Sequence, residues 1–179
     1  MKGIVFNLLE QSVTKAYGAD VWDDLVDEAG VSGAYTSLGN YLDSEVVALV
    51  GAASAKLGLP PGDILRWFGQ AAMPLLAEHY PKFFVNHVSS RDFILSVNKI
   101  IHPEVHKLYP GASCPFFKFR EADAGALVMD YESPRKLCDL AHGFVVGAAN
   151  FYHEKIDVVH QACMHHGDNA CVMEIKWAH

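Results

Sequence analysis

The spacing of the apolar residues changes once along the chain, and this change restricts the folds that the chain can adopt. In the first part, apolar residues recur at helical spacing in the stretches 5–17, 21–29, 44–58, 61–80 and 92–108. After residue 115 they follow the pattern of two hairpins, with strands at 116–121, 126–131, 158–165 and 170–177. One further helix separates the hairpins. This order predicts an α+β fold, in which a helical N-terminal part precedes a small four-stranded antiparallel sheet.

Local signals place several boundaries of these elements. Ser44 has the side chain of a helix N-cap, and Pro74 is expected to kink or interrupt the helix 61–80. Pro134 is expected just inside the start of the helix between the hairpins, because proline is favoured in a first helical turn.

Length and charge narrow the class of protein. The chain has 179 residues and a formal net charge of −7, which suits one domain, 1–179, and argues against a general nucleic-acid binder. We expect a helical lobe at about 1–60 and a second lobe at about 61–179. The sequence shows neither a signal peptide nor a transmembrane stretch, so we expect a soluble, cytoplasmic protein that does not bind membranes. Ten histidines and four cysteines favour metal, haem or redox chemistry.

His102 is the first candidate ligand. It follows Val97 and Ile101 on the apolar side of its helix, and Pro103 comes directly after it. A neutral imidazole on such a face is the usual axial ligand of haem iron. The alternative is a core histidine that bonds to a backbone carbonyl, and this residue alone leaves both interpretations open.

Tyr131, Ser133 and Arg135 form the second candidate site. Tyr131 and Ser133 are two residues apart on a strand, so they face the same side, and Arg135 follows at the expected helix start. A phenol, a hydroxyl and a guanidinium that point one way can bind a carboxylate or a phosphate. The alternative is an N-cap serine between a half-buried tyrosine and a solvated arginine.

Together these two stretches resemble the haem nitric oxide/oxygen-binding (H-NOX) family, which is related to the haem domain of soluble guanylate cyclase. His102, followed by Lys-Leu-Tyr-Pro-Gly-Ala at 107–112, is similar to the family's proximal histidine segment. The resemblance implies that Tyr131, Ser133 and Arg135, in a Tyr-x-Ser-x-Arg pattern, bind the propionates of haem b. It also implies that Pro115 presses on the porphyrin, whereas His106 lies outside the family pattern and is taken as structural.

The expected distal pocket indicates which gas is bound. Family members that hold oxygen stably have a tyrosine in the helix after the signature, and Leu140 stands at that position here. Leu140, Leu9, Val5 and Met73 are expected to form an apolar pocket. Oxygen bound to ferrous iron depends on a hydrogen-bond donor in the pocket, whereas bound nitric oxide depends on one very little. The resemblance therefore implies nitric oxide sensing.

Three of the four cysteines, together with one histidine, suggest a second metal. Cys138, His160, Cys163 and Cys171 offer three thiolates and one imidazole, the composition of a closed structural zinc site. Strand alternation places His160 and Cys163 on opposite faces, so a β-bulge must turn one of them. The spacing resembles that of a bacterial subset of the family. The alternative is a set of separate buried cysteines.

The resemblance implies a bacterial, non-enzymatic sensor. Nitric oxide is expected to weaken or break the bond between iron and His102, and the resulting conformational change regulates a partner. The implied partners are a histidine kinase or a cyclic-di-GMP cyclase or phosphodiesterase. A zinc/cysteine redox sensor that acts on the same kind of partner is the alternative function.

Overall fold

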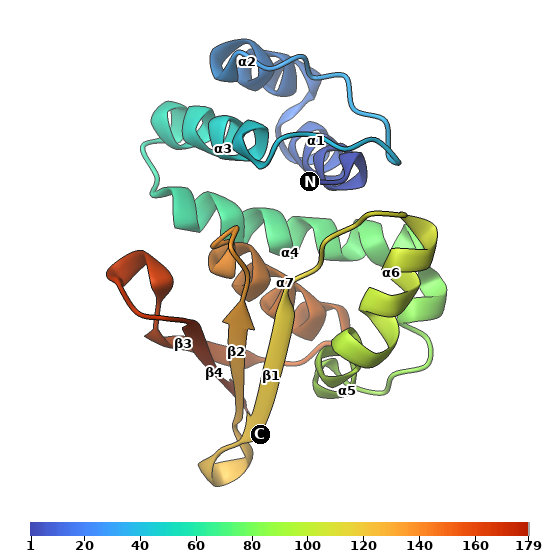
Figure 1. Ribbon diagram of the computed structural model, residues 1–179, viewed down its shortest axis with the longest axis vertical. Helices are drawn as coiled ribbons and strands as arrows, with labels where there is room; N and C mark the ends of the chain where they lie inside the picture. The colour runs from blue at the N-terminus through green and yellow to red at the C-terminus, as the bar shows by residue number, and fades with distance from the viewer. Residues whose placement is uncertain (179) are drawn as a thin grey trace.

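The computed structural model describes residues 1–178, so only His179 of the expected domain 1–179 lies outside the described residues. The fold is α+β, as predicted, and the helical part stacks above the sheet (Figure 1). The α-helices are α1 (Gly3–Tyr17), α2 (Ala19–Ala29), α3 (Asp43–Leu57), α4 (Pro61–His79), α5 (Ser90–Ser96), α6 (His102–Leu108) and α7 (Cys138–Phe151). The strands are β1 (Phe116–Glu121), β2 (Leu127–Glu132), β3 (Ile156–Ala162) and β4 (Cys171–Trp177).

The four strands form one antiparallel sheet in the order β1-β2-β4-β3. Met129, Met173 and Ile175 on its inner face are fully or almost fully buried and pack with residues of α7. On the outer face, cross-strand ion pairs join Lys118 to Glu132 and Arg120 to Asp130. This alternation of apolar and charged residues gives the sheet one core face and one solvent face.

Helices α4 and α7 make the most extensive contact between helices in the described chain, and glycines allow their close approach. A Cβ atom added at Gly69 of α4 would lie 2.5 Å from the backbone nitrogen of Phe144 in α7. A Cβ atom added at Gly143 would collide with the carbonyl oxygen of Arg66. The two backbones therefore touch directly, and α4 joins the helical lobe to the layer formed by α7 and the sheet (Figure 1).

Two boundary predictions, at Ser44 and Pro134, were wrong, and the interruption considered at Pro74 is absent. The N-cap of α3 is Leu42 rather than Ser44, because the Glu45 carboxylate accepts a hydrogen bond from the Leu42 amide at 3.3 Å. Pro74 does not interrupt α4, which is continuous from Pro61 to His79, since packing against α7 compensates for one missing backbone hydrogen bond.

Pro134 lies in a turn before α7 rather than inside it. The amide of Lys136 donates to the carbonyl oxygen of Ser133 at 3.2 Å, and Lys136 has a left-handed φ of 53°. This conformation cannot belong to an α-helix, so α7 begins only at Cys138.

The predicted helix 92–108 is divided into three parts. Between α5 and α6 lies a π-helical segment, Val97–Ile101, which leads directly into His102. Short π-helical turns inside α-helices often occur at functional sites.

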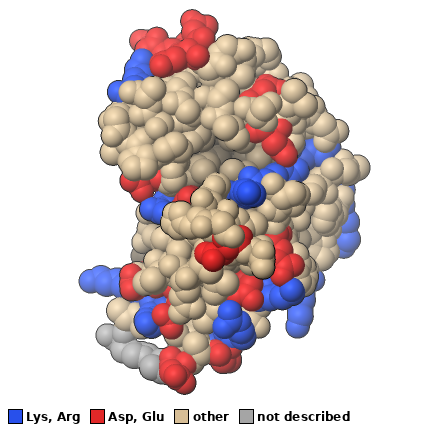
Figure 2. Space-filling view, turned by 60° about the vertical axis from the view of Figure 1, so that its left-hand side comes forward, with Lys and Arg blue, Asp and Glu red and all other residues tan. Residues whose placement is uncertain are grey.

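The surface charge is unevenly distributed. Figure 2 shows acidic side chains gathered over α2, at the end of the helical lobe, while lysines, arginines and acids mix around the sheet. Within residues 1–178, none of the helices has the length and apolar character needed to cross a membrane.

The contact between α4 and α7 leads to a testable prediction about two helical glycines. Gly69→Ala should lower the free energy of unfolding by about 1–3 kcal/mol, because the new methyl group meets backbone atoms that cannot move independently. A Cβ atom added at Gly51 in α3 would have no atom within 4 Å, so Gly51→Ala should raise stability by about 0.5–1 kcal/mol. Denaturant unfolding followed by circular dichroism measures both changes, and equal effects at the two positions would contradict the packing argument.

Candidate functional site

A cavity of about 420 Å³ lies between the helical lobe and the layer of α7 and the sheet. It has the size of a small-molecule or cofactor site, and most of its lining is apolar. Its walls come from four helical parts, namely α1, α4, the α5–α6 segment and the start of α7, and also from strand β2 and the loop that precedes β1. Among its lining residues are most of the predicted site residues, namely Val5, Met73, His102, Pro115, Tyr131, Ser133, Arg135 and Leu140.

His102 begins α6 and lines the cavity. Its ring stacks on Phe117 of β1, with the ring centroids 5.8 Å apart. Asn98, in the π-helical segment, holds the same strand, because its side chain bonds to both the amide and the carbonyl oxygen of Phe117. Burial, with a smaller contribution from His106, lowers the pKa of His102 to about 4. The imidazole is therefore neutral at pH 7, which is the form that binds a metal.

The predicted signature forms the polar rim of the cavity. Tyr131 is buried, and its phenol oxygen accepts a hydrogen bond from the Leu137 amide at 3.0 Å. The Ser133 hydroxyl accepts a bond from the Arg135 amide at 3.3 Å. These bonds fix the turn that brings all three signature side chains to one side of the cavity.

Arg135 is the cationic group of this rim. Its guanidinium pairs with Asp43 at 2.9 Å and donates to the carbonyl oxygen of Ser113 at 2.6 Å. Burial of Asp43 opposes its ionisation, but hydrogen bonds from the N-terminal ammonium and from Arg135 outweigh it and hold the pKa below its usual value. Asp43 was not predicted from the sequence, because it lies 92 residues from Arg135 and only the fold brings them together.

The loop before β1 supplies another wall of the cavity. Pro115 and Cys114 both line it, and Cys114 is a free, half-buried cysteine. Burial raises the pKa of the Cys114 thiol, while the nearby Arg135 charge partly offsets this effect.

The opposite wall is apolar, with one correction to its expected members. Val5, Met73 and Leu140 line the cavity, whereas Leu9 does not. Leu8 of α1 takes the place expected for Leu9, because the next residue along a helix is rotated by about 100° to another face. Leu9 instead packs in the core between α1 and its neighbouring helices and borders a second apolar cavity there.

Besides Tyr131, two phenols reach the cavity. Tyr80 follows α4 and Tyr109 follows α6, and their hydroxyls hydrogen-bond to each other. Burial, followed by the bond to Tyr80, raises the pKa of Tyr109 well above its usual value, so this phenol stays neutral at pH 7. No pattern in the sequence indicates this pair, whose members are 29 residues apart.

Three of the predicted zinc ligands form a separate buried cluster. Cys163 Sγ lies 3.7 Å from Cys138 Sγ and 3.8 Å from Cys171 Sγ. These distances are far too long for disulfides, which are about 2.0 Å. A tetrahedral zinc ion with bonds of about 2.3 Å holds its sulfur ligands about 3.8 Å apart. The cluster therefore has the spacing of a zinc site in its sulfur atoms.

Local backbone structure shapes this cluster. Cys138 opens α7, and Cys163 and Cys171 flank the turn between β3 and β4. The Met164 amide donates to Cys171 Sγ at 3.3 Å, and the Cys163 amide donates to the Asp168 carboxylate at 2.8 Å. Burial raises the pKa of the Cys171 thiol, and the amide donor from Met164 partly offsets this effect.

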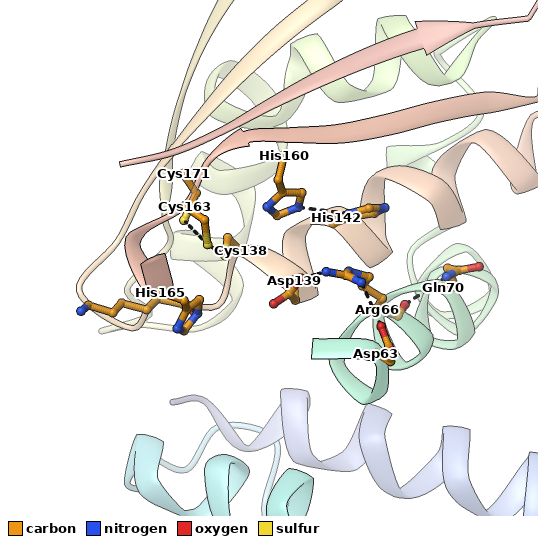
Figure 3. A network of polar contacts seen from close by, with 11 residues as sticks. Asp63, Arg66, Gln70, Cys138, Asp139, His142, His160, Cys163, His165 and Cys171 are labelled. Atoms are coloured by element: carbon orange, nitrogen blue, oxygen red, sulfur yellow. Dashed lines mark hydrogen bonds and ion pairs between the residues drawn. The ribbon is translucent and has the colours of Figure 1, made fainter. Parts of the chain in front are cut away.

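His160 lies outside the group of three cysteines. A register shift between His160 and Ala162 interrupts the pairing of β3 with β4, at the place where the sequence required a bulge. The His160 ring pairs with His142 of α7, an interaction that no pattern in the sequence predicts (Figure 3). His165 is a second imidazole near the cluster, grouped with Cys138 and Asp139, but it is exposed and bonds to the Lys136 carbonyl oxygen at 2.7 Å.

Comparison with known proteins gives a consistent result. The sequence model described as Haem-NO-binding matches residues 2–160. An H-NOX protein from S. oneidensis, solved by crystallography in the Fe(II)NO ligation state, is similar over 100% of both chains, with 31% identity and a TM-score of 0.93. A mutant of the H-NOX protein from K. algicida, in the unliganded Fe(II) state, has 25% identity and a TM-score of 0.88 over 100% of this chain and 97% of that one. A mutant of the T. tengcongensis H-NOX shares the fold, with 24% identity and a TM-score of 0.85 over 100% of this chain and 98% of that one.

The family match covers most of the chain, including the cavity walls and the signature at its rim. The chain therefore belongs to the Haem-NO-binding, or H-NOX, family, whose domains bind haem.

Proposed function

We propose that this domain is a nitric oxide sensor that holds haem b in the cavity, with His102 as the axial ligand. The observation that carries the proposal is one apolar cavity that combines a neutral imidazole with a cationic rim. Haem, when bound there, supplies an iron atom that takes a diatomic gas. The other residues suit the remainder of the group, because Tyr131, Ser133 and Arg135 offer donors for its two carboxylates.

Arg135 has to exchange partners to bind a propionate. Its guanidinium now contacts Asp43 and the Ser113 carbonyl oxygen, and of these two residues Ser113 lines the cavity. A guanidinium has five N–H donors, so it can keep one of these contacts and still bind a carboxylate. Pro115, in the same loop, lines the cavity and would offer a rigid ring to a flat ligand.

The apolar wall supports selectivity for nitric oxide over oxygen. Leu140, Val5 and Met73 carry no hydrogen-bond donor, and bound oxygen needs a donor far more than nitric oxide does. Of the phenols that line the cavity, Tyr80 and Tyr109 bond to each other, and Tyr131 belongs to the rim, where its oxygen accepts a bond from the Leu137 amide.

The proposed output is a movement of the segment that carries His102. This imidazole connects the cavity to α6, to the π-helical turn before it and, through Phe117, to the sheet. Loss of the constraint on His102 shifts the balance between two positions of this segment, which a partner protein can detect. From the membership in this family, we propose that the partner is a histidine kinase or a cyclic-di-GMP cyclase or phosphodiesterase. We also propose that the domain itself does not catalyse a reaction.

We also propose a zinc ion bound by Cys138, Cys163, Cys171 and His160. The sulfur spacing of 3.7 and 3.8 Å supports it directly. The bulge after His160 supports the fourth ligand, because it breaks the strand alternation that would keep His160 and Cys163 on opposite faces. Oxidation of these thiols would release the metal, which makes redox sensing a second candidate function for the same cluster.

The first prediction concerns the axial ligand. His102→Gly should abolish the five-coordinate ferrous haem spectrum, because no protein imidazole then reaches the iron, and added imidazole should restore it. His106 is four residues further along α6 and exposed, so His106→Ala serves as the matched control and should keep the normal spectrum. The reverse result would place the ligand one helical turn away from His102.

The second prediction concerns gas selectivity. The reduced protein should change its absorption spectrum with nitric oxide and with carbon monoxide, and it should keep the unliganded ferrous spectrum in air until it oxidises. The reason is the absence of a donor on Leu140, Val5 and Met73. A persistent new spectrum in air would contradict this prediction.

The third prediction concerns zinc. Elemental analysis should find one zinc per chain, and Cys163→Ser should lower both the zinc content and the melting temperature, because the metal links α7 to the β3–β4 hairpin. His160→Ala should also weaken zinc binding, whereas His165→Ala should not. Zinc that is retained in His160→Ala and lost in His165→Ala would assign the fourth ligand to His165.

A further inference from the structure

The two histidines beside the cysteine cluster form a pair that the haem cavity does not explain. His142 Nδ1 lies 3.1 Å from His160 Nε2, and the two ring planes are inclined by 27°, with centroids 5.2 Å apart. Both rings are partly buried between α7 and β3. In Figure 3 the His160 ring stands between His142 and the three cysteine side chains.

The pair divides the nitrogen atoms of His160 between two tasks. Its Nε2 is engaged with His142, so Nδ1 is the nitrogen of His160 left for a metal. A neutral imidazole carries one proton on one nitrogen, and metal binding at Nδ1 requires that this proton stay on Nε2. The Nε2–H group of His160 then donates to Nδ1 of His142. His142, as the acceptor, keeps its own proton on its Nε2.

The position of His142 on α7 suits this task. Cys138 and His142 are four residues apart, so they lie on the same face of the helix, one turn from each other. The ion pair between Arg66 and Asp139, with an N–O distance of 2.6 Å, ties this end of α7 to α4. The same helix therefore presents a thiol to the cluster and an imidazole to His160, in a fixed spatial relation.

We propose that His142 is the positioning residue of the zinc site: it accepts a hydrogen bond from His160 Nε2–H and so makes Nδ1 of His160 the zinc ligand. Histidine ligands of metals generally donate their other N–H to a carboxylate, a backbone carbonyl or a water, which fixes the tautomer and the ring orientation. Here the acceptor is an imidazole nitrogen. This inference rests on the zinc site proposed above. It adds a residue outside the four ligands and names the coordinating atom.

The test uses the purified full chain loaded with zinc. Long-range ¹H–¹⁵N correlation spectra of the histidine rings identify which nitrogen of His160 carries the proton and which binds the metal. We expect a protonated Nε2 and a metal-bound Nδ1. Zinc affinity is measured in parallel by competition with a chromophoric chelator, in the unsubstituted protein, in His142→Ala and in His142→Gln.

His142→Ala should weaken zinc binding by about 10- to 100-fold, the usual effect of removing such a partner. His142→Gln should recover most of that loss, because its carboxamide oxygen can accept the same hydrogen bond. His165→Ala is the matched control and should leave the affinity unchanged, since this exposed ring bonds elsewhere. A merely structural role for His142 predicts neither the Nδ1 coordination nor the rescue by glutamine.

The outcomes separate the inference from the zinc proposal. Zinc bound with equal affinity by the unsubstituted protein and His142→Ala, or coordination through Nε2 of His160, overturns the role of His142 and leaves the zinc site intact. An unsubstituted protein that binds no zinc overturns both. If His142→Ala fails to fold, as judged by circular dichroism, the spectra of the unsubstituted protein and the affinity of His142→Gln still decide the question.

Discussion

The direct backbone contact between α4 and α7 is the constraint on which the rest of this domain depends. It requires glycine at Gly69 and Gly143, because any larger residue would push the helices apart. Helix α4 carries the helical lobe and Met73, and α7 carries Leu140 and the start of the cysteine cluster. The separation of these helices thus sets both the depth of the cavity and the position of the sheet behind it.

Because α7 is rigidly placed, it connects two sites of different chemistry. Cys138 and Leu140 are two residues apart and point to different neighbours, the thiol to the cysteine cluster and the leucine to the cavity. A movement of the first turn of α7 must therefore displace a residue in the cysteine cluster and a residue in the cavity wall. This is a physical route that couples the state of the thiols to the cavity without a contact between the cysteines and the cavity walls.

Much of this architecture could be predicted because its signals are local. The extent of β1, the antiparallel sheet and the approximate ranges of α1 to α4 follow from apolar spacing and turn residues. The haem-binding roles expected for His102 and for the signature rest on the family pattern, since neither is distinctive alone. Their shared place in one cavity is a property of the fold.

The features that the sequence did not predict depend on contacts between distant residues or on the exact rotation of a side chain about its helix. The ion pair of Arg135 with Asp43 and the His142–His160 pair join residues that only the tertiary structure brings together. Leu8 and Leu9 differ by a single step along α1, so apolar spacing could not decide which of them faces the cavity. Lys136 has a left-handed backbone conformation, so α7 begins later in the chain than predicted. Nothing about a lysine in the sequence indicates that conformation.

The π-helical turn before His102 has a geometric consequence. Such a turn holds more residues than an α-helical turn, so the chain after it is out of phase with the chain before it. Removing the surplus residue from Val97–Ile101 would rotate α6 by about 100° relative to α5 and would swing the imidazole of His102 to a different bearing. The direction in which His102 points is thus set by the winding of five residues, and a change of one residue in that turn would re-aim it together with the residues of α6 that line the cavity.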